Sequence, residues 1–150
     1  MPGSTTASPD DQALLANALI RSSFLTMAVL SKQAAAHDIS LTQLRVLGIL
    51  QDRCLRMSEL ADYLGLDRST ISGLVDRLER RGLVERAPNA ADGRSIDVRL
   101  TPVGSAAAER GADEINDALA PFLVDLSSAE ARRLTALLEQ VLQQGPHLTA

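Results

Sequence analysis

Two stretches of this chain carry side chains whose types and spacing suit contacts with phosphates and base edges. The first combines hydroxyl and guanidinium groups with a glycine, at Arg68, Ser69, Thr70, Ser72, Gly73 and Arg77. Hydroxyls can bond to phosphate or base, and arginine can pair with guanine. The second stretch holds Asp92 and Arg94, with Arg86 before them and Arg99 after them. This chemistry predicts binding to a nucleic acid.

Helical periodicity surrounds the first stretch. Apolar residues recur at the spacing i, i+3, i+4 and i+7, at Ile71, Leu74, Val75 and Leu78, which predicts an amphipathic helix with these side chains buried. Asp67 is a good N-cap for it, and Gly82 a left-handed stop. A shorter helix before it should start after Ser58 and end at Gly65. Two helices joined by a tight turn are what a helix-turn-helix requires.

The second stretch has the pattern of a hairpin. Residues 83–86 and 96–100 read as strands, because apolar and charged residues alternate in the latter. Between them, Pro88-Asn-Ala-Ala-Asp-Gly93 is typical of turns. A hairpin beside a helix-turn-helix can reach a minor groove while the helix occupies the major groove. Double-stranded DNA is therefore the expected partner.

Helical patterns also flank this region. We expect a first helix at 10–37 and a second at 42–52, the latter capped by Ser40. After the hairpin, Thr101 should cap a fifth helix that Pro121 kinks or breaks, and Ser127 should cap a sixth. The apolar faces of the first, fifth and sixth helices are too rich for a small lobe to cover, which predicts a partner surface.

The overall composition permits this interpretation. The net charge is −4, but residues 53–101 hold nine of the fifteen basic residues against eight acidic ones. The excess of acid lies in the last third of the chain. Phosphate binding depends on local clusters more than on the total charge. A length of 150 residues favours a single domain, here 10–150, after a Ser/Thr/Pro leader at 1–9 that we expect to be disordered.

The same composition indicates a cytoplasmic protein. Cys54 is the only cysteine, so an internal disulfide is excluded and a reducing compartment is favoured. Residues 1–9 have no apolar core of the kind that a signal peptide needs. The apolar run from Ala13 to Leu30 contains Asn17 and Arg21, which argues against a membrane span.

The order of helices, helix-turn-helix, hairpin and helices resembles the multiple-antibiotic-resistance regulator (MarR) family of winged-helix transcription factors. The most specific match is in the hairpin, or wing: Asp92, one residue, Arg94, five residues, then Leu100-Thr101. Further matching positions are Leu60-Ala61, Leu64, Asp67, Thr70, Leu78 and Gly82-Leu83. The resemblance covers about residues 10–143. It implies a mainly α fold with a small β-hairpin wing, with a winged helix-turn-helix at 40–101 between dimerisation helices at 10–37 and 102–144.

The resemblance also implies a function. In the family, the first helix and the last two interleave in a homodimer, and two helix-turn-helix lobes bind a pseudo-palindrome, most often as a repressor. The wing arginine enters the minor groove and the aspartate two positions earlier orients it, roles that fall on Arg94 and Asp92. An arginine gains there from the enhanced negative potential of a narrow groove. Arg86 and Arg99 are expected as lesser phosphate contacts.

Asp76 departs from the expected pattern of a DNA-binding face. A carboxylate at this position would repel phosphate, unless it accepts from a cytosine amine or holds Arg77.

Many members of the family respond to small lipophilic effectors, and an effector is a possible partner here. The chain has only Phe24, Tyr63 and Phe122 as aromatic residues, so an aromatic cage is poorly supplied. A pocket of leucine, valine, alanine and Met27 remains open as an alternative. The sequence identifies neither the effector nor its binding residues.

Cys54 and the two histidines allow other chemistry to be weighed. Arg53 and Arg56 could lower the pKa of the Cys54 thiol and make it a redox sensor, but we favour a small apolar role. His37 and His147 are isolated, and no group of ligands has the spacing of a metal site. We expect neither a metal nor a cofactor.

Two other classes of function compete with a DNA-binding regulator. A winged helix can serve as a protein-interaction module without binding DNA, and the fold alone does not exclude this. Such a module has no need of the Asp92 and Arg94 pair, which therefore favours DNA. An enzyme is not expected, because no nucleophile–base pair, phosphate loop or paired-carboxylate site stands out.

Overall fold

The computed structural model describes residues 7–144. The predicted disorder of the leader concerns residues 1–9, of which 1–6 lie outside the described residues. The end of the leader is helical, contrary to that prediction. Pro9 is the first residue of helix α1, and the backbone N–H of Asp11 donates to the Ser8 hydroxyl at 3.2 Å. A serine N-cap followed by proline suits a helix start, because proline lacks the N–H that would be left unpaired there.

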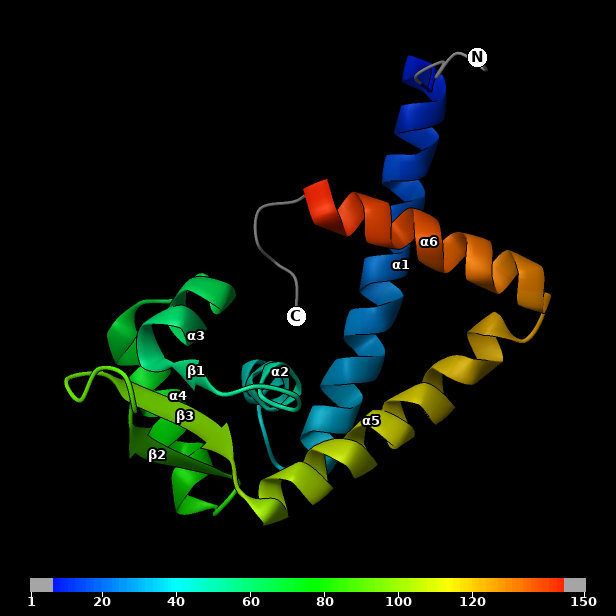
Figure 1. The fold of residues 1–150 in the computed structure, drawn as a ribbon. Helices are drawn as coiled ribbons and strands as arrows, with labels where there is room; N and C mark the ends of the chain where they lie inside the picture. The colour runs from blue at the N-terminus through cyan, green and yellow to red at the C-terminus, as the bar shows by residue number, and fades with distance from the viewer. Residues whose placement is uncertain (1–6, 145–150) are drawn as a thin grey trace.

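The described residues form six helices and three strands (Figure 1). In chain order they are α1 (Pro9–Ala36), α2 (Leu41–Ile49), β1 (Leu55–Arg56), α3 (Met57–Leu64), α4 (Arg68–Arg80), β2 (Val84–Pro88), β3 (Ile96–Leu100), α5 (Pro102–Leu123) and α6 (Ser128–Gln144). Helices α2, α3 and α4 and the sheet make one lobe, and α1 packs against α5 beside it (Figure 1). The mainly α fold with a small hairpin is confirmed.

The core of the lobe lies between α2, α3, α4 and the sheet. Its most deeply buried side chains are less than 2% exposed: Val46, Leu60, Ile71, Val75, Leu78, Val84 and Val98. Each aliphatic side chain of this size stabilises the fold by about 1.5–3 kcal/mol when fully buried. The predicted apolar face of α4 is the buried one, which leaves its polar face toward solvent.

The sheet is antiparallel, with strand order β1-β3-β2. β2 extends two residues beyond the predicted strand, because Ala87 and Pro88 still pair with Asp97 and Ile96 of β3. β1 was not predicted, since two residues are too few to show the alternation that identifies a strand. It pairs Leu55 with Val98 and so joins the wing to the body of the lobe.

Several helix ends confirm the predictions, whereas others correct them. Gly65 and Gly82 have positive φ of 64° and 68°, as left-handed C-terminal glycines should. α3 begins at Met57, so the prediction of Ser58 as its N-cap was wrong; Arg56 occupies the cap and its N–H donates to the Glu59 carboxylate at 2.8 Å. α2 ends at Ile49, three residues early, because the chain must turn to enter β1. Of the kink or break predicted at Pro121, the break is absent, because α5 continues to Leu123.

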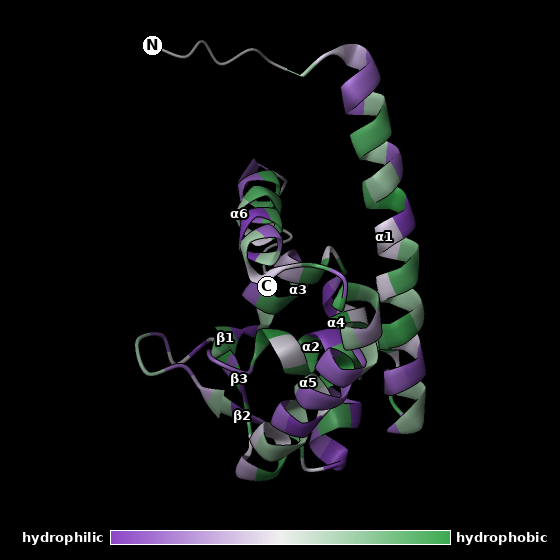
Figure 2. Cartoon of the chain, turned by 90° about the vertical axis from the view of Figure 1, so that its right-hand side faces the viewer, coloured by the Kyte–Doolittle hydropathy of each residue, from purple (hydrophilic) through white to green (hydrophobic). Residues whose placement is uncertain are grey.

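The long helices expose much of their apolar surface, as Figure 2 shows for α1 and α6. α6 has no buried residue, and in α1 only Ala34 is buried. By length and composition alone α1 could cross a membrane, a criterion that core helices of soluble proteins also meet. The apolar faces predicted for the first, fifth and sixth helices are thus present and uncovered in the single chain.

Candidate nucleic-acid interface

The polar face of α4 carries the six residues that the sequence predicts to contact DNA. Arg68, Ser69, Thr70 and Arg77 are exposed, and Ser72 and Gly73 are half-buried. A Cβ added to Gly73 would approach only the Arg77 guanidinium, at 3.6 Å. The face therefore allows a close backbone approach at its centre, with basic side chains before and after it.

Asp67 orders the start of this helix. Its carboxylate accepts the Thr70 N–H at 2.9 Å and the hydroxyls of Ser69 and Thr70 at 2.5 and 2.6 Å. The hydroxyl of Ser69, then that of Thr70, holds the pKa of Asp67 well below its usual range. The two hydroxyls predicted to contact DNA thus donate their protons to the cap, so each can accept a hydrogen bond as it stands but must leave Asp67 to donate to a phosphate.

The wing loop is held by a second set of short-range hydrogen bonds. The Asp92 carboxylate accepts the Arg94 N–H at 3.1 Å and the Ser95 hydroxyl at 2.8 Å, and the Ser95 hydroxyl in particular lowers the pKa of Asp92. Asn89 accepts the N–H groups of residues 91 and 92 at 2.9 Å, and its amide donates to Asp97. The sequence predicted only that Asn89 lies in a turn. Its role in holding the loop depends on the hydrogen bond to Asp97 of β3, which the sequence pattern does not reveal.

Arg94 lies exposed on this ordered loop. Asp92 was expected to orient it, and the structure shows the bond going to the backbone of Arg94 instead of its guanidinium. Asp92 therefore sets the position of the Arg94 backbone and leaves its side chain available to a groove.

The two other nominated arginines are both paired with acids. Arg99 of β3 pairs with Glu85 of β2 at 2.6 Å and is more than half exposed. Arg86 is only 24% exposed and pairs with two carboxylates of α4, those of Asp76 and Glu79. The sequence left open that Asp76 pairs with Arg77. Asp76 does pair with an arginine, but that arginine is Arg86.

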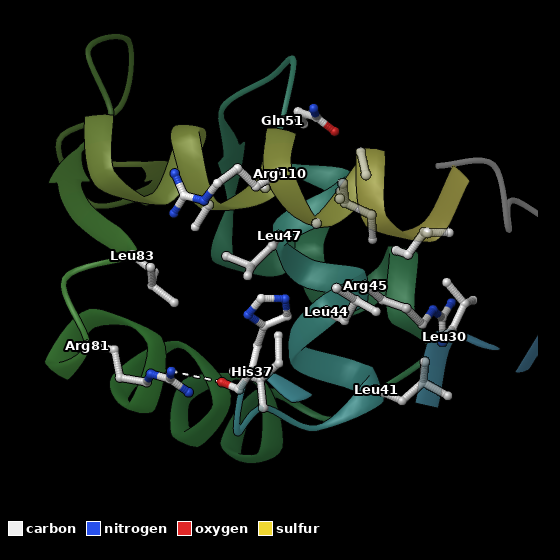
Figure 3. A pocket seen from close by; sticks show the side chains of 18 of the residues that line it. Leu30, His37, Leu41, Leu44, Arg45, Leu47, Gln51, Arg81, Leu83 and Arg110 are labelled. Carbon is white, nitrogen blue, oxygen red and sulfur yellow. Dashed lines mark hydrogen bonds between the residues drawn. The ribbon is translucent and has the colours of Figure 1, made fainter. Parts of the chain in front are cut away.

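A cavity of about 540 Å³ lies between α1, α2 and α5, on the other side of the core (Figure 3). Its wall is mostly leucine, alanine and isoleucine, with Tyr63 and the cationic side chains Arg45, Arg81 and Arg110. The leucines and alanines agree with the pocket that the sequence left open, but neither Met27 nor any valine is among the lining residues. The sequence could not locate this cavity, because its walls come from four separate segments.

His37 stands at the edge of this cavity and is not isolated, contrary to the prediction. Its Nε2 lies 2.6 Å from a carboxylate oxygen of Glu114, a residue 77 positions away. The Arg81 guanidinium at the end of α4 donates to the carbonyls of His37 and Asp38 at 2.9 and 2.7 Å (Figure 3). His147 lies outside the described residues.

Cys54 is exposed, which disagrees with the predicted role as a small apolar residue. It lies just before β1, one of the two edge strands of the sheet. Partial desolvation, followed by the charge of Asp97, raises the pKa of the Cys54 thiol. A raised thiol pKa disfavours the thiolate that a redox sensor needs.

Comparison with known proteins identifies the family. Residues 37–95 match the MarR family. The HTH-type transcriptional regulator PecS of Dickeya dadantii is 31% identical over 136 residues, which span 85% of this chain and 80% of PecS. The chain belongs to the MarR family. It is accordingly a DNA-binding transcriptional regulator, in agreement with the prediction.

Further MarR-family relatives extend the comparison. The transcriptional regulator YfiV of Bacillus subtilis is 40% identical over 65 residues, which span 43% of this chain and 41% of YfiV. Wild-type MarR from E. coli superposes with a TM-score of 0.73 at 27% identity, covering 92% of this chain and 99% of MarR. A cysteine-to-serine variant of MarR in complex with operator DNA gives a TM-score of 0.66 at 27% identity, with 91% and 99% covered. YfiV and PecS are both HTH-type transcriptional regulators.

Proposed function

We propose that this MarR-family chain is a homodimeric repressor that binds a pseudo-palindromic operator. The observation that supports it most directly is an exposed polar face of α4 beside an ordered wing that presents Arg94. In this proposal α4 enters the major groove and the wing enters the adjacent minor groove. Two such lobes would read half-sites about 10 bp apart. Repression is proposed because it is the family's commoner mode.

Each predicted site residue other than Arg86 has a proposed part in binding. Arg68 and Arg77 would pair with phosphate or guanine, while the hydroxyls of Ser69, Thr70 and Ser72 would bond to phosphate or base edges. Gly73 would allow the backbone to approach the bases. On the wing, Arg94 would occupy the minor groove from the loop that Asp92 orders, with Arg99 near a phosphate.

The homodimer is proposed from the uncovered apolar surface. Helices α1, α5 and α6 carry large side chains that are 39–69% exposed, among them Leu14, Phe24, Phe122, Leu134, Leu137, Leu138 and Val141. Soluble monomers rarely expose contiguous apolar surface of this extent. A second copy of the same helices would cover it, with the two winged lobes on one side.

We further propose a cytoplasmic location. DNA is present there, and a reducing compartment keeps the thiol of Cys54 unoxidised.

We propose that the cavity receives a small amphipathic anion that releases the repressor from DNA. Leucine side chains such as Leu44 and Leu47 suit an apolar body, and Arg45, Arg81 and Arg110 suit a carboxylate or phenolate. Benzoate and benzyl alcohol are a matched pair of probes, because they share a ring and only benzoate is charged. Benzoate should raise the melting temperature more than benzyl alcohol. Equal shifts would contradict the assignment of a charged ligand.

Operator binding is the direct test of the proposed function. The wild type and Arg94→Ala should be titrated by fluorescence anisotropy against DNA upstream of the chain's own gene, at about 0.15 M salt with scrambled competitor. We expect tight, competitor-resistant binding by the wild type, and a loss of about 1–3 kcal/mol in the variant with its dimer intact.

Two outcomes would count against the proposal. Unchanged affinity in Arg94→Ala would show that the wing does not contact DNA. Weak wild-type binding that is equal on operator and scrambled DNA would favour the protein-interaction alternative, which a pull-down would then examine.

A further inference from the structure

Arg86 of β2 is bound to three successive turns of α4. Its guanidinium donates to Glu79 at 2.5 Å and to the Ser72 carbonyl at 3.3 Å, and lies 2.7 Å from the Asp76 carboxylate. Its backbone N–H also donates to Glu79, at 3.2 Å. Residues 72, 76 and 79 have the spacing i, i+4 and i+7, so they share one stripe of the helix. A single side chain from the wing sheet therefore binds α4, the helix whose polar face is proposed to contact DNA (the reading face).

The charge around Arg86 opposes its use as a phosphate contact. Two carboxylates surround one guanidinium, and the Arg86 side chain is only 24% exposed. If the guanidinium turned to a phosphate, Asp76 and Glu79 would be left unpaired close to DNA. That exchange loses two charge-assisted hydrogen bonds for one and adds repulsion.

The connection matters because α4 and the wing must reach two adjacent grooves together. Arg86 is paired with Val98 in the β2–β3 hairpin, at whose tip the Arg94 loop lies. Arg99 and Glu85 form the other ion pair of the hairpin, but that pair joins β3 to β2 and has no hydrogen bond or ion pair with α4 among residues 7–144. The Arg86 bridge is thus the ionic link between the two proposed DNA-contacting elements among the described residues.

We infer that Arg86 is a positioning residue that holds the wing against α4 through Asp76 and Glu79, and that it does not contact phosphate. The inference rests on the proposed roles of α4 and the wing. It also accounts for Asp76, whose carboxylate otherwise has no place on a face that meets DNA. Without the bridge, only the apolar core between α4 and the sheet fixes the orientation of the wing, so specific binding should weaken more than non-specific binding.

Asp76→Asn separates this inference from a phosphate contact, because the two predict opposite signs. Neutralising an acid near DNA normally strengthens binding, since it removes repulsion and would release Arg86 toward a phosphate. If Arg86 positions the wing, Asp76→Asn should instead weaken operator binding by about 5-fold or more and leave scrambled-DNA binding unchanged. Glu85→Gln is the matched control, because it removes the acid of an ion pair within the same sheet; its operator affinity should be unchanged or slightly higher.

Arg86→Lys is the second variant, and it keeps the charge without the planar fork. Lysine can serve as a point-charge contact to phosphate, but it cannot bridge two carboxylates in the same way. We expect Arg86→Lys to lose operator affinity as Asp76→Asn does, with the slope of log Kd against log salt unchanged. Thermal unfolding of Asp76→Asn should stay close to that of the wild type, because the Asp76 side chain is more than half exposed.

The results that would overturn the inference are distinct from those that bear on the proposed function. Tighter operator binding by Asp76→Asn, or wild-type affinity in Arg86→Lys, would show that Arg86 does not position the wing. A salt slope lower by about 0.9 in Arg86→Gln would indicate a lost phosphate contact. By contrast, failure of the wild type to prefer operator over scrambled DNA would defeat the proposed function itself.

Discussion

Asp67 and Asp92 each order the backbone next to a side chain that is proposed to meet DNA. Neither carboxylate forms an ion pair with a basic side chain among residues 7–144. Both accept hydrogen bonds from hydroxyls and backbone N–H groups within three residues. In both cases the bonds lower the pKa of the carboxyl group, with a serine hydroxyl as the largest cause. The residues proposed to face DNA are therefore arranged by short-range acceptors, and the side chains of Arg68, Arg77 and Arg94 remain exposed.

The lowered pKa of Asp67 predicts a pH dependence of stability. A carboxyl group with a lower pKa in the folded state contributes stability that is complete above its unfolded pKa, about 3.9, and is lost as the pH falls further. Asp67→Asn keeps a good N-cap without the charge. The wild type should therefore be more stable than Asp67→Asn at pH 7, and the difference should shrink toward pH 3. Urea unfolding at both pH values measures this, and a constant difference would contradict the role given to the ionised carboxylate.

At the scale of elements, the start of α5 is pressed against the end of the helix-turn-helix. The Thr101 hydroxyl donates to the Gly82 carbonyl at 2.6 Å, and its N–H donates to the Leu83 carbonyl at 3.1 Å. Gly104 is buried at this contact, and a Cβ there would lie 1.8 Å from the Leu83 carbonyl oxygen. This junction joins the proposed reading lobe to the proposed dimerisation helices, so its close packing sets the direction in which α5 leaves the lobe.

Gly104→Ala should therefore destabilise the fold by about 3 kcal/mol, at the upper end of the cost of overpacking, because backbone atoms cannot rotate away. Gly111→Ala is the control in the same helix. It meets nothing within 4 Å, so it should stabilise by about 0.5–1 kcal/mol through helix propensity. Thermal or urea unfolding distinguishes the two substitutions, and equal effects would mean that the contact with Leu83 relaxes freely.

At the scale of the whole molecule, the lobe is well packed while the long helices are not. The lobe buries a core between α2, α3, α4 and the sheet, whereas α6 buries none of its residues in the single chain. A helix of 17 residues gains little stability from propensity alone and depends on covering its apolar face. The uncovered face is the physical reason to expect a second copy.

The proposed dimer predicts the effect of charge on α6. Leu134 and Leu138 lie one turn apart and are 43% and 39% exposed in the single chain. Glutamates at both positions would bury two carboxylates in the interface, so the double variant should sediment as a monomer while the wild type sediments as a dimer. A matched pair, Gln140→Glu with Gln143→Glu, adds the same charge on the other side of the helix and should leave the dimer intact. A dimeric Leu134/Leu138 variant would place the interface elsewhere.

Features that depend on a few neighbouring residues were predicted well. The helix of the reading face, the caps at Ser40, Asp67 and Thr101, and the left-handed glycines are all observed. The error at Ser58 is also local, because the Glu59 carboxylate accepts the Arg56 N–H and caps α3 one residue earlier. α5 does not break at Pro121, which lies two residues before the end of the helix. The two-residue β1 carried too little pattern to be found.

The amino-acid sequence by itself determined the order of elements, the buried and polar faces of α4 and the family, because periodicity, caps and motif spacing are written within a few residues of one another. Only the tertiary structure decided what distant side chains meet. It brought Arg86 to Asp76 and Glu79, His37 to Glu114, and four segments around one cavity. Such pairings depend on how the helices and strands pack against one another. The sequence alone therefore does not distinguish an arginine that binds phosphate from one that forms ion pairs with a neighbouring helix.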